Sequence, residues 1–142
     1  CCREDFVTLI REPPLCLIAM GDRGQVHIED TDVWLYTHWG ARDLPNTVAD
    51  AIGRNERWHD PEYLTRIIFD EMTGEDTGAT GYGIGKAQHG DVYRVVHINC
   101  GQGEMTLETG LAAWHDGDEE ANTATFTFEE VARGSQFGWP ER

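Results

Sequence analysis

Residues 60–74 constrain the fold of this chain more than any other segment. Asp60 and Pro61 form a helix start signal, because Asp is a favoured N-cap residue and Pro is tolerated in the first turn. Gly74 supplies the stop signal. The segment predicts an amphipathic helix that buries one face against a second layer. The apolar residues of that face, which recur with a period of 3.6, are Tyr63, Leu64, Ile67, Ile68 and Met72.

Two β-rich segments and a shorter helix precede this element. Residues 24–30 (GQVHIED) alternate, and residues 33–38 (VWLYTH) are rich in β-branched and aromatic side chains. Residues 29–32 (EDTD) predict a turn between them, and therefore an antiparallel hairpin. The helix that follows has Asp43 as its N-cap and Pro45 in its first turn. Its apolar positions at helical spacing are Val48, Ala49 and Ile52.

The second half of the chain predicts further strands. Residues 75–85 form a Gly- and Thr-rich loop that leads into a short strand, and residues 91–99 and 104–108 form two more. Residues 125–128 form an edge strand or lead into a last helical turn at 129–132. The order ββααβββ(α) predicts an α+β fold: a single two-layer domain in which an antiparallel sheet carries two helices packed on one face.

The charge balance restricts the partners of the chain. Its 26 Asp and Glu residues stand against 11 basic residues, of which only Lys86 is a lysine, and the formal net charge is −15. Self-repulsion destabilises such a chain at low salt, whereas molar salt shortens the Debye length to about 3 Å and screens it. We therefore expect a halophilic, cytoplasmic protein; the alternative is an ordinary acidic protein from a GC-rich genome. Nucleic acid and membranes are disfavoured as partners.

The first 19 residues differ in composition from the rest. They contain a Pro-Pro pair and three of the four cysteines, and Met20 has the character of a natural start. We expect residues 1–19 to be a leader or upstream segment and residues 20–142 to be one domain with an acidic, partly irregular C-terminal third. Cys100 is then the only thiol of the domain, which is typical of a reducing cytoplasm.

Two short motifs carry candidate binding residues. His38 and Trp39 lie where a strand leads toward a helix, and polar and aromatic groups at strand ends often line pockets. Arg57 and Arg66 flank the start of the second helix and are able to clamp an anion there, with Trp58 stacking on a ring. The alternative is structural: the tryptophans complete the core and the arginines pair with surface carboxylates.

A glycine-rich motif at residues 80–86 (TGYGIGK) adds Tyr82 to this set. Converging N–H groups of a glycine loop bind phosphate, but the spacing matches neither the P-loop nor the dinucleotide-binding fingerprint. Alternating glycines on a strand fit close packing equally well. The predicted ligand-binding set is His38, Trp39, Arg57, Trp58, Arg66 and Tyr82.

The sequence contains no complete metal or catalytic motif. The six histidines lack the local zinc spacings, so we expect no metal site and no cofactor; His89 and Asp91 would need tertiary proximity to join one. No nucleophile elbow surrounds the only serine, Ser135. The histidines are His27, His38, His59, His89, His97 and His115.

Five strings of this sequence resemble a widespread group of short, acidic, uncharacterised proteins of haloarchaea, other prokaryotes and their viruses. The strings are VWLYTHWG, LPNTVADAI, RWHDPEYLTRIIFDEM, TGYGIG and HGDVYRVV. The resemblance spans about residues 20–100 and supports Met20 as the start. It implies no activity, because the group has no established function or site.

Three functional hypotheses follow. The leading one is a small, non-catalytic accessory protein that binds a small ligand, for example a nucleotide-like one, or a protein partner. The second is a structural protein that forms a homo-oligomer through apolar residues of its C-terminal part. Those residues are Trp114, Phe126, Phe128, Phe137 and Trp139. The third is a small hydrolase-type enzyme with His38, His59 or His89 as general base.

Overall fold

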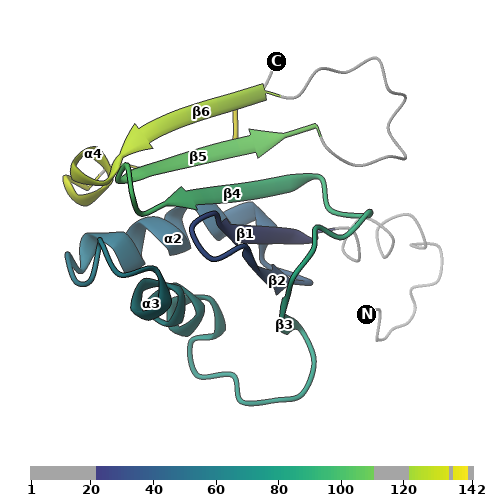
Figure 1. The fold of residues 1–142 in the computed structure, drawn as a ribbon. Coiled ribbons are helices and arrows are strands. Elements are labelled where there is room, and N and C mark those ends of the chain that lie inside the picture. Colours follow the sequence, from purple (N-terminus) through teal and green to yellow (C-terminus); the bar gives the residue numbers. More distant parts are fainter. Residues whose placement is uncertain (1–21, 111–121, 135, 141–142) are drawn as a thin grey trace.

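The computed structural model describes residues 22–110, 122–134 and 136–140, and it has an α+β fold (Figure 1). A six-stranded sheet is accompanied by three α-helices and one 3₁₀ turn within these residues. The strands are β1 (Gly24–Ile28), β2 (Val33–Thr37), β3 (Tyr82–Gly85), β4 (Arg94–Asn99), β5 (Glu104–Thr109) and β6 (Asn122–Thr127). The helices are η1 (Ala41–Asp43), α2 (Leu44–Gly53), α3 (Pro61–Thr73) and α4 (Phe128–Ala132).

The sheet is mixed rather than antiparallel. Its strand order is β3-β2-β1-β4-β5-β6, and β1 and β4 are parallel while the other neighbours are antiparallel. The chain path explains this. Strand β3 lies outside β2, and residues 86–93 return across the sheet to bring β4 beside β1. The prediction of a purely antiparallel sheet was wrong at this pair, because a local pattern does not indicate which strand a returning chain joins.

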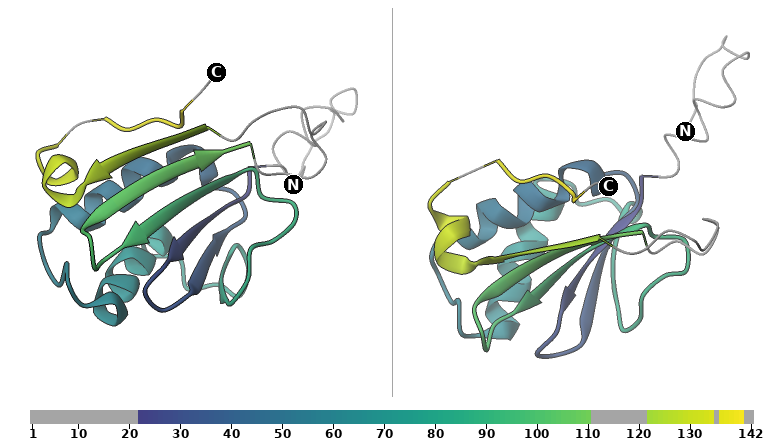
Figure 2. Two further views of the ribbon diagram at one scale, coloured as in Figure 1. Left: turned by 45° about the horizontal axis from the view of Figure 1, so that its top comes forward. Right: turned by 90° about the horizontal axis from the view of Figure 1, so that it is seen from above.

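Helices α2, α3 and α4 cover one face of the sheet (Figure 2). The apolar stripe of α3 buries Leu64 and Ile68 as its period predicts, and α2 buries Val48 and Ile52. These side chains pack against strand residues that point to the same face. The strand residues of this core are Val26, Ile28, Leu35, Val96, Ile98, Met105 and Leu107.

The two predicted helix starts have different outcomes. Asp60 is the N-cap of α3, and its carboxylate accepts a hydrogen bond from the Tyr63 N–H, as predicted. Asp43 makes no such bond, because the 3₁₀ turn η1 runs directly into α2 and ends at this residue. Pro45 still occupies the first turn of α2.

Residues 122–132 combine both alternatives that the sequence left open. Strand β6 pairs with β5, and α4 follows at once with a capping box between Thr127 and Glu130. The observed order is therefore ββααββββα, with one strand more than predicted.

The C-terminal aromatic residues belong to the core. The Asn46 side chain makes two hydrogen bonds of 2.9 Å to the backbone of Phe137, and the Trp139 indole N–H donates to the Ala41 carbonyl. Phe128 is also buried, and Phe126 packs against the same core. Of these aromatics, Phe128 and Phe137 are buried and Phe126 and Trp139 are partly buried. The homo-oligomer hypothesis remains a prediction. Trp114 lies outside the described residues.

Some sequence predictions fall on other parts of the chain. The expected leader, residues 1–19, and residues 111–121 of the acidic C-terminal third lie outside the described residues. Among the helices that the structure describes, none combines the length and the apolar character that crossing a membrane requires.

Candidate functional site

The sheet face opposite the helices carries polar, charged and aromatic side chains. Successive strand residues point to opposite faces, so these side chains alternate with the core positions of β1, β2, β4 and β5. None of the described helices covers this open face (Figure 2). Its members are Gln25, His27, Trp34, Tyr36, Val95, His97, Thr106 and Glu108. Because histidine, amide and carboxylate groups gather on this face beside a small apolar cluster, we treat the open face as the candidate functional site.

Residues 86–93, the crossing segment, cover part of the open face between β3 and β4. The buried side chain of Gln25 holds this segment: its Nε2 donates to the Ala87 carbonyl at 3.2 Å, and its Oε1 accepts the His89 N–H at 2.9 Å. Val92 is buried in a small apolar cluster on the same side. The crossing segment therefore forms a fixed wall on this face.

Two histidines lie side by side on the open face. His27 of β1 and His97 of β4 are register partners, and their Nδ1 atoms are 3.2 Å apart. Their side chains are 17 % and 18 % exposed, so both imidazoles are largely removed from water. Trp34 stacks on the His27 ring, with ring centroids 3.9 Å apart and planes 11° apart. This stacking restricts the orientation of the His27 imidazole.

Three carboxylates surround the histidine pair. Nε2 of His27 lies 2.9 Å from Asp32 Oδ1, and Nε2 of His97 lies 2.6 Å from Glu108 Oε1. The hydrogen bond with His27 lowers the pKa of Asp32. Glu29 Oε2 lies 3.6 Å from His97 Nδ1. We call these five residues the histidine cluster.

Three residues of the histidine cluster have the spacing of metal ligands. His27, Glu29 and His97 each offer one ligand atom, and these atoms lie within 4.8 Å of one another. Imidazole nitrogen and carboxylate oxygen are both ligands of Zn²⁺ and related ions. The cluster is thus able to hold a cation as well as protons.

Tyr36 and His38 form a second polar contact at the end of β2. The Tyr36 hydroxyl and the His38 Nδ1 are 3.1 Å apart. Burial raises the pKa of Tyr36. Burial also lowers the pKa of His38, and the nearby positive charge of Arg23 lowers it further. Arg23 itself is paired with Asp91. The contact is therefore an uncharged hydrogen bond at neutral pH.

The structure brings three of the six predicted ligand-binding residues together. Tyr82 is the register partner of Thr37, and the His38 N–H donates to the Gly81 carbonyl at 2.9 Å. The rings of His38 and Trp39 meet edge to face, with centroids 4.2 Å apart. Trp39 is 49 % exposed, so it does not close the core edge as the structural alternative supposed.

The other three residues lie away from this group: Arg57 and Trp58 precede α3, and Arg66 lies within it. The Trp58 indole N–H donates to the Ile52 carbonyl at 2.9 Å, and its ring meets the buried Phe128 edge to face. Arg57 and Arg66 each lie beside a carboxylate of their own region of the chain. The six residues therefore do not converge on one pocket. Ligand binding by either group remains a prediction.

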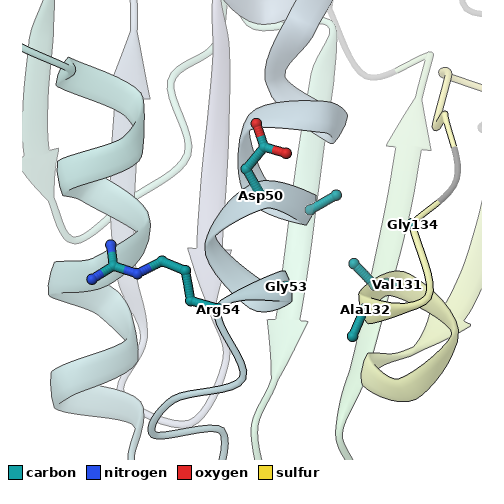
Figure 3. Close-up of a pocket in the computed structure, with 7 residues that line it drawn as sticks. Asp50, Gly53, Arg54, Val131, Ala132 and Gly134 are labelled. Carbon is teal, nitrogen blue, oxygen red and sulfur yellow. The ribbon is translucent and has the colours of Figure 1, made fainter.

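A shallow depression of about 290 Å³ lies between α2 and α4 (Figure 3). Its walls are mostly small or apolar, and Arg54 extends away from it toward α3, where its guanidinium lies 3.7 Å from Glu71. Little beyond the Asp50 carboxylate remains to recognise a ligand, so this depression is a poor candidate site. The lining residues are Ala49, Asp50, Gly53, Arg54, Val131, Ala132 and Gly134.

One repeat in the sequence coincides with the histidine cluster. The tripeptide Val-His-Ile occurs twice, at residues 26–28 and 96–98, and the structure pairs the two copies in register on parallel strands. Zinc motifs are recognised by short local spacings, whereas these two histidines are 70 residues apart.

No protein-family model, curated protein or solved structure matches this chain. The resemblance to the uncharacterised group therefore remains a prediction, and the functional argument depends on the geometry of the site.

Proposed function

We propose that this chain is a small, non-catalytic accessory protein that binds a cationic ligand on the open face of its sheet. The histidine cluster is the observation that carries the proposal. Three carboxylates meet two largely buried imidazoles there, and no Lys or Arg of the described residues forms an ion pair with Glu29, Asp32 or Glu108. Carboxylates beside two imidazoles attract positive charge, so a cation at this cluster is favoured.

A nucleotide-like ligand has less support at this site. Clustered carboxylates repel phosphate. The arginines that were expected to clamp it lie elsewhere, Arg57 at 3.9 Å from Asp60 and Arg66 at 3.5 Å from Asp70. The geometry therefore favours a cation over the anion that the sequence suggested.

The charge of the whole chain agrees with this ligand class. A net charge of −15 raises the local concentration of cations and repels nucleic acid. We retain the halophilic and cytoplasmic setting as part of the proposal, because molar salt screens the self-repulsion of the chain.

A protein partner at the β3 edge is the second candidate. Ile84 is 64 % exposed and Trp39 is 49 % exposed, and residues 77–85 contain no charged side chain. A neutral, apolar edge is where another chain approaches with least repulsion. Sedimentation in high KCl tests it: an oligomer that Ile84→Asp dissociates supports a second copy as partner, and a monomeric wild type argues against self-association.

The cation proposal is tested on protein purified in high KCl. The protein is denatured, and released metals and organic cations are quantified together in wild type, Glu108→Gln and His59→Ala. His59 is an exposed histidine near the start of α3 and serves as the control. We expect a stoichiometric cation that E108Q reduces and H59A retains. A released anion, or equal cation content in all three proteins, would contradict the proposal.

A further inference from the structure

We infer that the cation is a transition-metal ion of the Zn²⁺ class, held by Nδ1 of His27, Nδ1 of His97 and the carboxylate of Glu29. The inference rests on the proposed function and specifies its ligand. The three ligands come from three places in the fold: strand β1, the adjacent strand β4 and the turn after β1.

The spacing of the ligand atoms fits such an ion. Two nitrogens bound to a tetrahedral Zn²⁺ at about 2.0–2.1 Å lie about 3.4 Å from each other. The two Nδ1 atoms are 3.2 Å apart, and Glu29 Oε2 is 3.6 Å from the His97 Nδ1. All three ligand atoms lie within 4.8 Å of one another. An ion therefore fits between the two imidazoles, and the Glu29 carboxylate moves toward it to complete the set.

The outer nitrogens give an independent reason. Each Nε2 faces a carboxylate, Asp32 for His27 and Glu108 for His97, and metal-bound histidines usually donate their second N–H to such a partner. When both Nε2 atoms donate, both Nδ1 lone pairs point at the same space. That arrangement is repulsive unless a proton or a metal ion lies between the two nitrogens.

The supporting structure holds the ligands in place. His27 and His97 are on adjacent strands in register, and Trp34 stacks on the His27 ring. Asn99 Nδ2 donates to Glu29 Oε1 at 3.2 Å, which leaves Oε2 directed at His97. Ligands fixed by packing and by a second layer of hydrogen bonds are what a preorganised metal site requires.

The donor set selects the class of metal. Two imidazoles and one carboxylate suit Zn²⁺, Co²⁺ and Ni²⁺, whereas Mg²⁺ and Ca²⁺ prefer sites made wholly of oxygen. Three protein ligands leave a fourth position for water or for a partner group. Asp32 and Glu108 act as positioning residues, because they hold the imidazoles without touching the ion.

Metal titration against a chromophoric chelator tests the inference, with Co²⁺ spectra to report the ligand field. We expect one Zn²⁺ or Co²⁺ per chain and a tetrahedral Co²⁺ spectrum. His97→Ala and Glu29→Gln should each abolish or strongly weaken binding, and Glu108→Gln should weaken it about 10–100-fold. The Glu29 side chain is 41 % exposed, more than that of His97, so E29Q is less prone to misfolding than H97A. His59→Ala should bind as wild type does.

The outcomes separate this inference from the proposed function. If only Mg²⁺ or an organic cation binds, in a way that E108Q weakens, the metal assignment is wrong and cation binding stands. If Zn²⁺ binding is equal in wild type, H97A, E29Q and E108Q, the ion binds outside the histidine cluster and both proposals fail. If no cation of any class binds, both fail. A shared proton between His27 and His97 then accounts for the 3.2 Å contact.

Discussion

His27 and His97 occupy the same position of two identical tripeptides on adjacent parallel strands, and their imidazoles therefore meet on one face of the sheet. Register partners of a parallel pair point to the same side. The pairing of β1 with β4 depends on the crossing segment, residues 86–93, which Gln25 holds through two hydrogen bonds. The geometry of the histidine cluster thus depends on Gln25, whose two hydrogen bonds go to the crossing segment and not to the cluster.

We expect Gln25→Ala to destabilise the protein by about 1–3 kcal/mol. The substitution removes the partners of the Ala87 carbonyl and the His89 N–H and leaves a cavity at a fully buried position. Urea denaturation in high KCl measures the change, and hydrogen exchange of the His89 amide should become faster. Gln102→Ala, in an exposed turn, is the control and should stay within about 0.5 kcal/mol of wild type. Unchanged exchange at His89 would show that Gln25 does not hold the crossing segment.

The sequence was sufficient to predict most elements and the antiparallel β1–β2 hairpin, but not every pairing of strands. The start of α3 was predictable because Asp60 and Pro61 act locally, through a side-chain hydrogen bond and a fixed backbone angle. The parallel β1–β4 pair was not, because it joins segments 70 residues apart through a chain reversal with no local signature. An alternating pattern indicates which side chains share a face, not which strand is the neighbour.

The candidate site was harder to predict for the same reason. Of the six residues that were predicted to share one pocket, His38, Trp39 and Tyr82 lie near one another, since they lie at the ends of strands that pair directly. His27 and His97 were passed over, because each lies in an ordinary alternating strand and only tertiary pairing brings them together. Arg57, Arg66 and Trp58 were predicted to bind a ligand because of their residue types. The described contacts of Trp58, however, are those of a core residue.

Trp58→Phe should therefore lower stability and leave ligand binding unchanged. The substitution removes the indole N–H that satisfies the Ile52 carbonyl and reduces the contact with Phe128, and we expect a loss of about 1–3 kcal/mol. Thermal unfolding and the cation content of the purified protein are measured together. Loss of the bound cation in a variant that remains folded would return Trp58 to the list of binding residues.

Cys100 should be unreactive in the folded protein. Burial, with a contribution from Asp30, raises the pKa of its thiol to about 12. The reactive thiolate is then scarce until the pH approaches that value, whereas an unfolded cysteine ionises near about 8.5. At about pH 8 we expect alkylation by iodoacetamide to be slower in the folded than in the urea-unfolded chain by roughly a thousandfold.

Peptide mapping by mass spectrometry distinguishes Cys100 from the three cysteines of residues 1–19. The folded rate should rise about tenfold per pH unit, because the thiolate fraction does so below the pKa. Similar rates in the folded and unfolded chains would show that the thiol is accessible and its pKa ordinary.

Stability should increase with salt if the charge of −15 reflects adaptation to a salt-rich cytoplasm. Raising KCl from about 0.1 M to about 1 M shortens the Debye length from about 10 Å to about 3 Å and screens carboxylate repulsion. We expect a gain of at least about 1 kcal/mol, or roughly 3–5 °C in Tm for a chain of this size. Thermal unfolding at a series of KCl concentrations measures it.

A charge-neutralising variant separates screening from general salt effects on burial. Asp50→Asn with Glu75→Gln removes two exposed negative charges, and it should raise the low-salt Tm while changing the high-salt Tm little. If the Tm of the variant and the Tm of the wild type rise equally with KCl, the salt effect is not due to screening of carboxylate repulsion. A Tm that does not rise with KCl would favour the alternative of an ordinary acidic protein from a GC-rich genome, because its stability would then not depend on the surface charge being screened.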